Sequence, residues 1–208
     1  MELEGYQVLA RRDREGQCDG GVLVFVKDEY APRVTLVETS EVAERIWAIV
    51  HSDRGPYLVC CWYRPPKPGN VKAIESFEAE YIRHKDGVLG VFVLGDLNVH
   101  SIRWLMHSAR ESVEGRLLQD ISSKHCFRQV VREPTRGEHL LDLVLTDVPG
   151  CKAKPCAAVA DHKGVLTQVK FTVPETASHQ GEVWHFADAD WDRLVSNIVD
   201  TDLEFLSL

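Results

Sequence analysis

The sequence predicts an α+β fold in which two packed, mostly antiparallel sheets are flanked by helices. Short runs rich in β-branched and aromatic residues recur along most of the chain, which is typical of strands. Two stretches with apolar residues at helical spacing interrupt these runs. An element order of hairpins broken by crossover helices favours a two-sheet architecture.

The first part of the chain is predicted to form strands. Residues 6–10 and 22–27 are β-rich and flank a charged stretch that contains two adjacent glycines, which suits a hairpin. Further strands are predicted at residues 33–37, 46–51 and 57–63. The last of these ends before Pro65 and Pro66, because proline cannot donate a hydrogen bond to a neighbouring strand.

The hydrophobic period then changes from that of a strand to that of a helix. From Val71, apolar residues recur at helical spacing as far as Ile82, and Asn70 is available as the N-cap. Val113, Leu117, Leu118 and Ile121 form a second helical stripe. Strands are predicted around these helices at residues 91–97, 127–131, 140–146 and 165–171.

A domain boundary is predicted near Val173. Residues 1–173 contain the strands and the two helices, whereas residues 174–208 begin with a polar segment and continue with apolar residues at helical spacing. We therefore expect one globular domain followed by a linker that carries an amphipathic helix. A chain of 208 residues is long enough for a domain of this kind.

Composition limits the function only loosely. The net charge is -8, so the chain as a whole gives no support to nucleic-acid binding. Local basic clusters remain, although each is also explained as a solvated loop. The clusters are Arg11, Arg12 and Arg14; Arg132 and Arg136; and Lys152 and Lys154.

The six cysteines show no CxxC pair, so we expect reduced thiols, with Cys151 and Cys156 as the alternative of a metal-binding pair. The N-terminal residues do not resemble a secretory signal. The longest apolar run, residues 88–95, is far shorter than the roughly 18–20 residues that cross a bilayer. We therefore expect an intracellular protein, nuclear or cytoplasmic, without a membrane span.

Candidate catalytic residues follow the strand at residues 91–97. Four apolar residues run into Gly95, and Asp96 and Asn98 then lie two positions apart, on one face of an extended chain. A carboxylate can position water or a metal, and a carboxamide can hold a phosphoryl oxygen. The alternative is a turn in which both side chains cap backbone amides.

Two further acids and a histidine lie in or beside later strands. Asp142 interrupts the apolar run of residues 140–146, where a buried carboxylate would need a partner, although an edge strand would expose it to water. Asp161 and His162 precede the strand at residues 165–171. A histidine with one carboxylate to fix its tautomer can act as an acid or a base, but such a pair also occurs in surface turns.

Taken in order, five segments resemble successive motifs of the endonuclease/exonuclease/phosphatase superfamily, and most of all the apurinic-type endonuclease of non-LTR, LINE-like retrotransposons. The likeness covers residues 6–171, and residues 184–194 resemble the linker to a reverse transcriptase, which would lie outside this chain. The segments are Trp62-Tyr63-Arg64-Pro65-Pro66, residues 94–100, Glu133-Pro134-Thr135-Arg136, residues 140–147 and Ala160-Asp161-His162.

The resemblance implies a four-layer α/β sandwich with its active site at one edge between the sheets, where a divalent cation, Mg²⁺, assists cleavage of a DNA phosphodiester. Asp96 would align or activate the attacking water, and Asn98 would contact the phosphate. Asp142 would orient His162, which would bind the scissile phosphate or shuttle a proton. The remaining implied roles are Tyr63 contacting phosphate, Thr135 and Arg136 lying near the substrate, and Asp161 lying beside the metal together with Asp96.

Two departures from the family pattern affect these expectations. Ala160 stands where the family usually has serine. No segment before Tyr6 matches the family's first strands, which carry an asparagine and the glutamate that is the principal metal ligand. We therefore expect a sheet that lacks these strands and weak Mg²⁺ binding. The functions to be weighed are a DNA endonuclease, a non-catalytic remnant of one, and a phosphatase or phosphodiesterase acting on another phosphoester.

Overall fold

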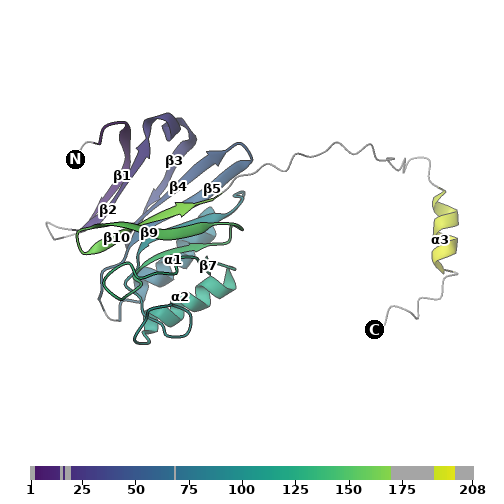
Figure 1. The fold of residues 1–208 in the computed structure, drawn as a ribbon. Helices are drawn as coiled ribbons and strands as arrows, with labels where there is room; N and C mark the ends of the chain where they lie inside the picture. Colours follow the sequence, from purple (N-terminus) through teal and green to yellow (C-terminus); the bar gives the residue numbers. More distant parts are fainter. Residues whose placement is uncertain (1–2, 15, 17–19, 68, 170–189, 200–208) are drawn as a thin grey trace. The chain divides into compact units, whose positions relative to one another are not determined.

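The structure is a computed structural model that describes residues 3–14, 16, 20–67, 69–169 and 190–199. The chain divides into two compact units, Met1–Thr172 and Val173–Leu208, and each is described by itself. The predicted boundary near Val173 lies outside the described residues. In the second unit, the described part is the helix α3, Trp191–Val199 (Figure 1).

A six-stranded sheet forms the centre of the first unit (Figure 1). All neighbouring strands are antiparallel except β5 and β6, which are parallel. The parallel step requires a crossover, and the helix α1 lies in that connection. In spatial order the strands are β3 (Val34–Thr39), β4 (Glu44–Ser52), β5 (Gly55–Tyr63), β6 (Val91–Asp96), β8 (Asp142–Thr146) and β7 (Arg128–Gln129).

Two helices cover one face of this sheet. In α1 (Lys72–His84), Phe77 is fully buried and stacks on Trp47 of β4 and Trp62 of β5. In α2 (Val113–Lys124), Leu118 and Ile121 join the same apolar core. Both helices therefore bury most of the predicted stripes, but Ile82 at the end of the first stripe and Val113 at the start of the second are exposed.

The helix caps differ in part from the expectation. The N-cap of α1 is Val71, without a side-chain hydrogen bond, and not Asn70 as predicted. The first turn is closed by backbone bonds instead, since the carbonyl of Val71 accepts from the amides of Ile74 and Glu75. Ser112 caps α2 in the usual way, its hydroxyl accepting a hydrogen bond from the amide of Gly115 at 2.9 Å.

Strand pairs pack on the opposite face of the central sheet. The predicted hairpin is present as β1 (Tyr6–Asp13) and β2 (Gly21–Lys27), which contact β4 and β5. The pair β9 (Lys152–Val159) and β10 (His162–Gln168) places Ala153 and Val165 against the main core. The two-sheet α+β class is thus confirmed, with helices on one face of the central sheet and strands on the other.

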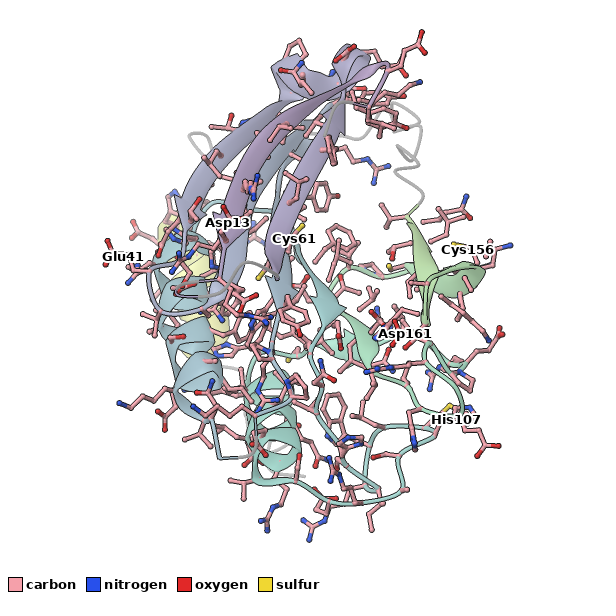
Figure 2. The ribbon with its side chains drawn as sticks, turned by 90° about the vertical axis from the view of Figure 1, so that its left-hand side faces the viewer. Asp13, Glu41, Cys61, His107, Cys156 and Asp161 are labelled. Atoms are coloured by element: carbon pink, nitrogen blue, oxygen red, sulfur yellow. The ribbon has the colours of Figure 1, made fainter. Side chains whose placement is uncertain are left out.

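This second layer of strands is interrupted. Among the described residues, β1 pairs only with β2, and β9 pairs only with β10, so the layer consists of two separate two-stranded sheets. Figure 2 shows the two pairs as separate ribbons, purple for β1 and β2 and green for β9 and β10.

Several element bounds differ from the sequence-based expectation. The strand β9 was not predicted, because its sequence contains two lysines, a proline and three alanines, which are poor strand formers. The strand predicted at residues 165–171 begins at His162, and its predicted end, Phe171, lies outside the described residues. Residues 127–131 contribute only the short β7. No helix of the described part of the chain is long and apolar enough to cross a membrane.

Candidate active site

Two acids lie opposite each other at the ends of two neighbouring inner strands of the sheet. Asp96 is the last residue of β6, Asp142 is the first residue of the antiparallel β8, and the two are direct partners in the register. Directly paired residues of neighbouring strands point to the same face. Along β6, Val91 and Val93 are buried under the helices, and the side chains of Phe92, Leu94 and Asp96 point to the other face. Both acids therefore lie on the face that the strand pairs cover.

Gly95 allows β6 to approach β5 at this point. A β-carbon on Gly95 would lie 1.8 Å from the carbonyl oxygen of Trp62, and its φ of 149° is in the region that favours glycine. The amide of Arg64 donates to the carbonyl of Asp96 at 2.8 Å, immediately beyond the last parallel pair. The glycine in the predicted motif therefore serves close packing of the backbone beside the acid.

His162 completes a cluster with the two acids. It is the first residue of β10, and its Nδ1 lies 2.8 Å from Oδ2 of Asp142, at hydrogen-bond distance. Its Nε2 lies 4.0 Å from Oδ2 of Asp96. Because a carboxylate only accepts, Asp142 holds the proton of His162 on Nδ1 and leaves Nε2 facing Asp96. Of Asp96, Asn98, Asp142, Asp161 and His162, which were expected to converge, the structure brings Asp96, Asp142 and His162 together in one cluster.

Asp96 is held in an unfavourable environment for a charge. Its Oδ1 is buried and has no hydrogen-bond partner among the described residues. Burial, and next the negative charge of Asp142, raise the pKa of Asp96 to about 6, while His162 acts in the opposite direction. A carboxyl group with a pKa near neutrality is suited to accept a proton from water, which is what a general base requires.

Thr135 positions Asp142 and does not reach the surface. Its side chain is fully buried, and Oγ1 accepts hydrogen bonds from the amides of Leu141 at 3.1 Å and Asp142 at 3.0 Å. Its carbonyl accepts from the amide of Lys163 at 2.8 Å, which ties β10 to the start of β8. The expectation that Thr135 binds substrate does not fit this position, because a fully buried side chain has no access to a ligand.

Asn98 lies beside the cluster in a constrained conformation. Its φ is 46°, in the left-handed region that asparagine tolerates better than most residues, and its Nδ2 donates to the carbonyl of Arg64 at 3.0 Å. The guanidinium of Arg64 binds the same loop by donating hydrogen bonds to the carbonyls of Leu97 and Asn98. The loop after β6 is thus fixed by hydrogen bonds from both residues.

A buried ion pair anchors this loop to α2. Arg64 is 2% exposed and lies 3.0 Å from Oε1 of Glu114, which also accepts from the amide of Gly69. Arg64 lies within one of the motifs that carry the resemblance, but no role was predicted from the sequence for Arg64 or for Glu114. The only signal was an arginine directly after an apolar strand, where a charge without a partner would be costly.

Tyr63, Asp161 and Arg136 lie outside the cluster. Tyr63 ends β5, and its ring lies 5.1 Å from the guanidinium carbon of Arg14, which also pairs with Glu44. Asp161 is in the exposed turn before β10 (Figure 2), and its Oδ2 lies 2.6 Å from Nη2 of Arg136. Asp161 therefore does not join the Asp96–Asp142–His162 group, because the turn directs its carboxylate to Arg136 at the surface.

Solved structures share this arrangement of elements. The endonuclease domain of TRAS1, a telomere-specific non-LTR retrotransposon, superposes with a TM-score of 0.57 and 14% sequence identity, over 82% of this chain and 83% of that one. The chain has the fold of a retrotransposon endonuclease domain. No protein-family model matches the sequence, and no curated protein matches it.

Two proteins described as endonuclease/exonuclease/phosphatase structures are also similar. One, from Bacteroides thetaiotaomicron, has a TM-score of 0.48 and 14% identity, over 79% of this chain and 75% of that chain. The other, from Beutenbergia cavernae, has a TM-score of 0.40 and 19% identity, over 59% of this chain and 38% of that chain. The resemblance to a retrotransposon endonuclease is supported at the level of the fold by the TRAS1 domain.

The cluster of this endonuclease-like fold suits a hard cation only weakly. Asp96, Asp142 and His162 each offer one ligand atom, and these atoms lie within 4.8 Å of one another. Asp142 and His162 already engage one atom each in the hydrogen bond between them, whereas Oδ1 of Asp96 has no hydrogen-bond partner among the described residues. Mg²⁺ is commonly held by one or two carboxylates together with waters and substrate phosphate, so the donor set fits a weakly bound ion.

Proposed function

We propose that the chain is a metal-dependent phosphodiesterase of the retrotransposon DNA endonuclease type, which nicks DNA by hydrolysing one phosphodiester. The observation that carries the proposal is the contact between Asp142 and His162, with Nε2 of His162 directed towards Asp96. This order of an orienting acid, a histidine and a second acid is a known way to move protons at neutral pH. The shared fold adds the framework in which the cluster lies.

The residues have distinct roles in this proposal. Asp96, with its pKa raised to about 6, accepts a proton from the attacking water. His162 binds a phosphate oxygen through Nε2 and, when protonated, donates to the leaving oxygen, while Asp142 fixes the ring. Asn98 holds a phosphoryl oxygen. A Mg²⁺ ion held by Asp96 and the substrate phosphate would lower the charge on the scissile group.

A single assay tests this proposal. The full chain is incubated with supercoiled plasmid and Mg²⁺ at millimolar concentration, beside Asp96→Ala and His162→Ala proteins purified in the same way. Because the donor set is small, we expect slow nicking that is lost in both variants and on chelation of the metal. A folded wild-type chain that does not nick under any divalent metal would favour the non-catalytic alternative. Equal nicking by all three proteins would reveal a contaminating nuclease.

The alternative of a phosphatase or phosphodiesterase acting on a smaller phosphoester is separated by substrate. A small phosphodiester, such as bis(p-nitrophenyl) phosphate, and a phosphomonoester are offered to the same three proteins. The proposal requires hydrolysis of the diester and not of the monoester. Faster hydrolysis of the monoester than of plasmid DNA would replace the endonuclease assignment by the phosphatase one.

A further inference from the structure

A basic pocket lies away from the Asp96–Asp142–His162 cluster, where β7 meets the β9–β10 pair. Its volume is about 610 Å³, and four of its lining residues carry a positive charge and none a negative one. The four cations, called the basic pocket residues from here on, are Arg128, Arg132, Lys152 and Lys154. None of the four belongs to the Asp96–Asp142–His162 cluster.

The fold brings these cations together from separate parts of the sequence. Lys152 and Lys154 pair directly with Gln168 and Leu166 in the register of β9 and β10, so all four side chains share one face of the pair. Arg128 belongs to β7, and Arg132 follows shortly after it. Two of the three basic clusters noted in the sequence thus contribute to a single surface.

The positive charge of the pocket is not neutralised within the described part of the chain. None of the four cations has a carboxylate at salt-bridge distance there. Nη2 of Arg128 donates to the carbonyl of Val148 at 3.1 Å, and Arg132 contacts the sulfur of Met106 at 4.0 Å. The four cations are exposed, and in a chain with a net charge of -8 they form a local positive surface that attracts anions.

The position of the pocket limits the kind of anion. Four residues of extended chain separate His162 from Leu166, which corresponds to roughly 13 Å at about 3.3 Å per residue. Phosphates of one DNA strand advance about 3.4 Å along the duplex axis per nucleotide. A nucleic acid whose scissile phosphate lies at His162 therefore has further phosphates about four nucleotides away, at the distance of the pocket.

We propose that the basic pocket residues bind the phosphate backbone of a nucleic acid at a second point, separate from the Asp96–Asp142–His162 cluster. The choice of a nucleic acid over other polyanions rests on the proposed function, whereas the anion site rests on the pocket alone. Such contacts position a polymer without reading its sequence. They also compensate for the unfavourable net charge of the chain.

Binding is measured without divalent metal, so that no DNA is cleaved. The full chain is titrated into a labelled DNA duplex at several salt concentrations, and anisotropy gives the Kd. The test protein carries Lys152→Ala and Lys154→Ala. The control carries Lys72→Ala and Arg116→Ala, which remove the same charge from exposed positions on α1 and α2 without described acidic partners. Thermal unfolding of all proteins shows that they remain folded.

Log K falls with log salt, and each phosphate contact adds about 0.9 to the magnitude of that slope. Removing both lysines should therefore lower the magnitude of the slope by nearly 2 and raise the Kd on the order of tenfold. The control should change neither value. Equal effects of the two double variants, or no effect of either, would overturn the proposal. If inorganic phosphate occupies the pocket but duplex binding is unaffected by the lysine pair, the site takes a small anion and the polymer assignment is wrong.

The same proteins separate this proposal from the proposed function. The protein that carries Lys152→Ala and Lys154→Ala should hydrolyse bis(p-nitrophenyl) phosphate at the wild-type rate, because that substrate does not extend to the pocket. Asp96→Ala should lose hydrolysis and keep duplex binding. A chain that hydrolyses nothing, yet binds duplex DNA in a manner that depends on Lys152 and Lys154, would refute the enzymatic assignment and leave the backbone site standing.

Discussion

Nδ1 of His162 lies 2.8 Å from Oδ2 of Asp142, although the two residues are 20 positions apart and belong to different sheets. The contact joins the central sheet to the β9–β10 pair at the point where Asp96 also ends its strand. It is therefore both a chemical relationship and a link between two layers of the fold.

The first prediction concerns the orienting acid. Asp142→Asn keeps the size of the side chain but no longer holds the proton of His162 on Nδ1 by charge. We expect hydrolysis of the small diester to fall by about 10²–10⁴-fold, the usual contribution of acid–base catalysis, with the thermal midpoint little changed. Full activity of a folded Asp142→Asn protein would show that His162 is not oriented in this way.

The second prediction follows from the raised pKa of Asp96. A carboxyl group whose pKa is about 6 in the folded chain and 3.8 in the unfolded chain binds more protons when folded between these values. Stability should therefore fall as the pH rises from about 4 through 6, by roughly 1–3 kcal/mol. Urea unfolding at several pH values measures this, and Asp96→Asn should remove that part of the slope and be more stable than wild type at pH 7. A slope unchanged by the substitution would contradict it.

The third prediction tests Thr135 as a positioning residue. Thr135→Val removes the acceptor for two buried amides while keeping the shape, so we expect a loss of about 2–4 kcal/mol in the free energy of unfolding. Thr135→Ser retains the hydroxyl oxygen and should lose about 1 kcal/mol or less, the scale of a missing methyl group. Similar losses for both variants, measured by urea unfolding, would rule out the hydrogen bonds as the cause.

The fourth prediction compares two glycines. Gly95→Ala places a β-carbon 1.8 Å from the carbonyl of Trp62 and should prevent β5 and β6 from pairing, with a loss of more than about 3 kcal/mol. Gly87 also has a positive φ, but a β-carbon there meets nothing within 4 Å, so Gly87→Ala should lose about 1 kcal/mol. Soluble yield and thermal unfolding compare them, and a stable Gly95→Ala protein would mean that the two strands have room to separate.

The sequence allowed the central sheet and the helices to be predicted because their apolar residues repeat with the period of the element. Asp96, Asn98 and Asp142 could be singled out because each ends or interrupts an apolar run, and His162 because it lies beside Asp161 before a strand. The second layer was harder. β9 has the composition of a loop and becomes a strand by pairing with β10, and this tertiary pairing leaves no local pattern.

Side-chain roles were predicted less well than positions. Thr135 and Asp161 both lie within the expected motifs, yet one hydroxyl faces inwards to two amides and one carboxylate faces outwards to Arg136. Which way a residue points in an irregular segment depends on backbone angles that are fixed by distant contacts. Glu114 was missed for the same reason, since its partner Arg64 is 50 residues away.

The interruption of the strand layer has a consequence for the integrity of the site. His162 lies on a two-stranded sheet, which has little stability of its own, whereas Asp96 and Asp142 lie at the ends of two inner strands of a six-stranded sheet. The Asp96–Asp142–His162 cluster is therefore assembled by packing a weakly stable strand pair onto the central sheet, and the Asp142–His162 contact and the bond from Lys163 to Thr135 join the two. Amides of β10 should exchange their hydrogens long before those of β6. A ligand that contacts both the central sheet and the β9–β10 pair would reduce this difference in exchange rate by holding the two together.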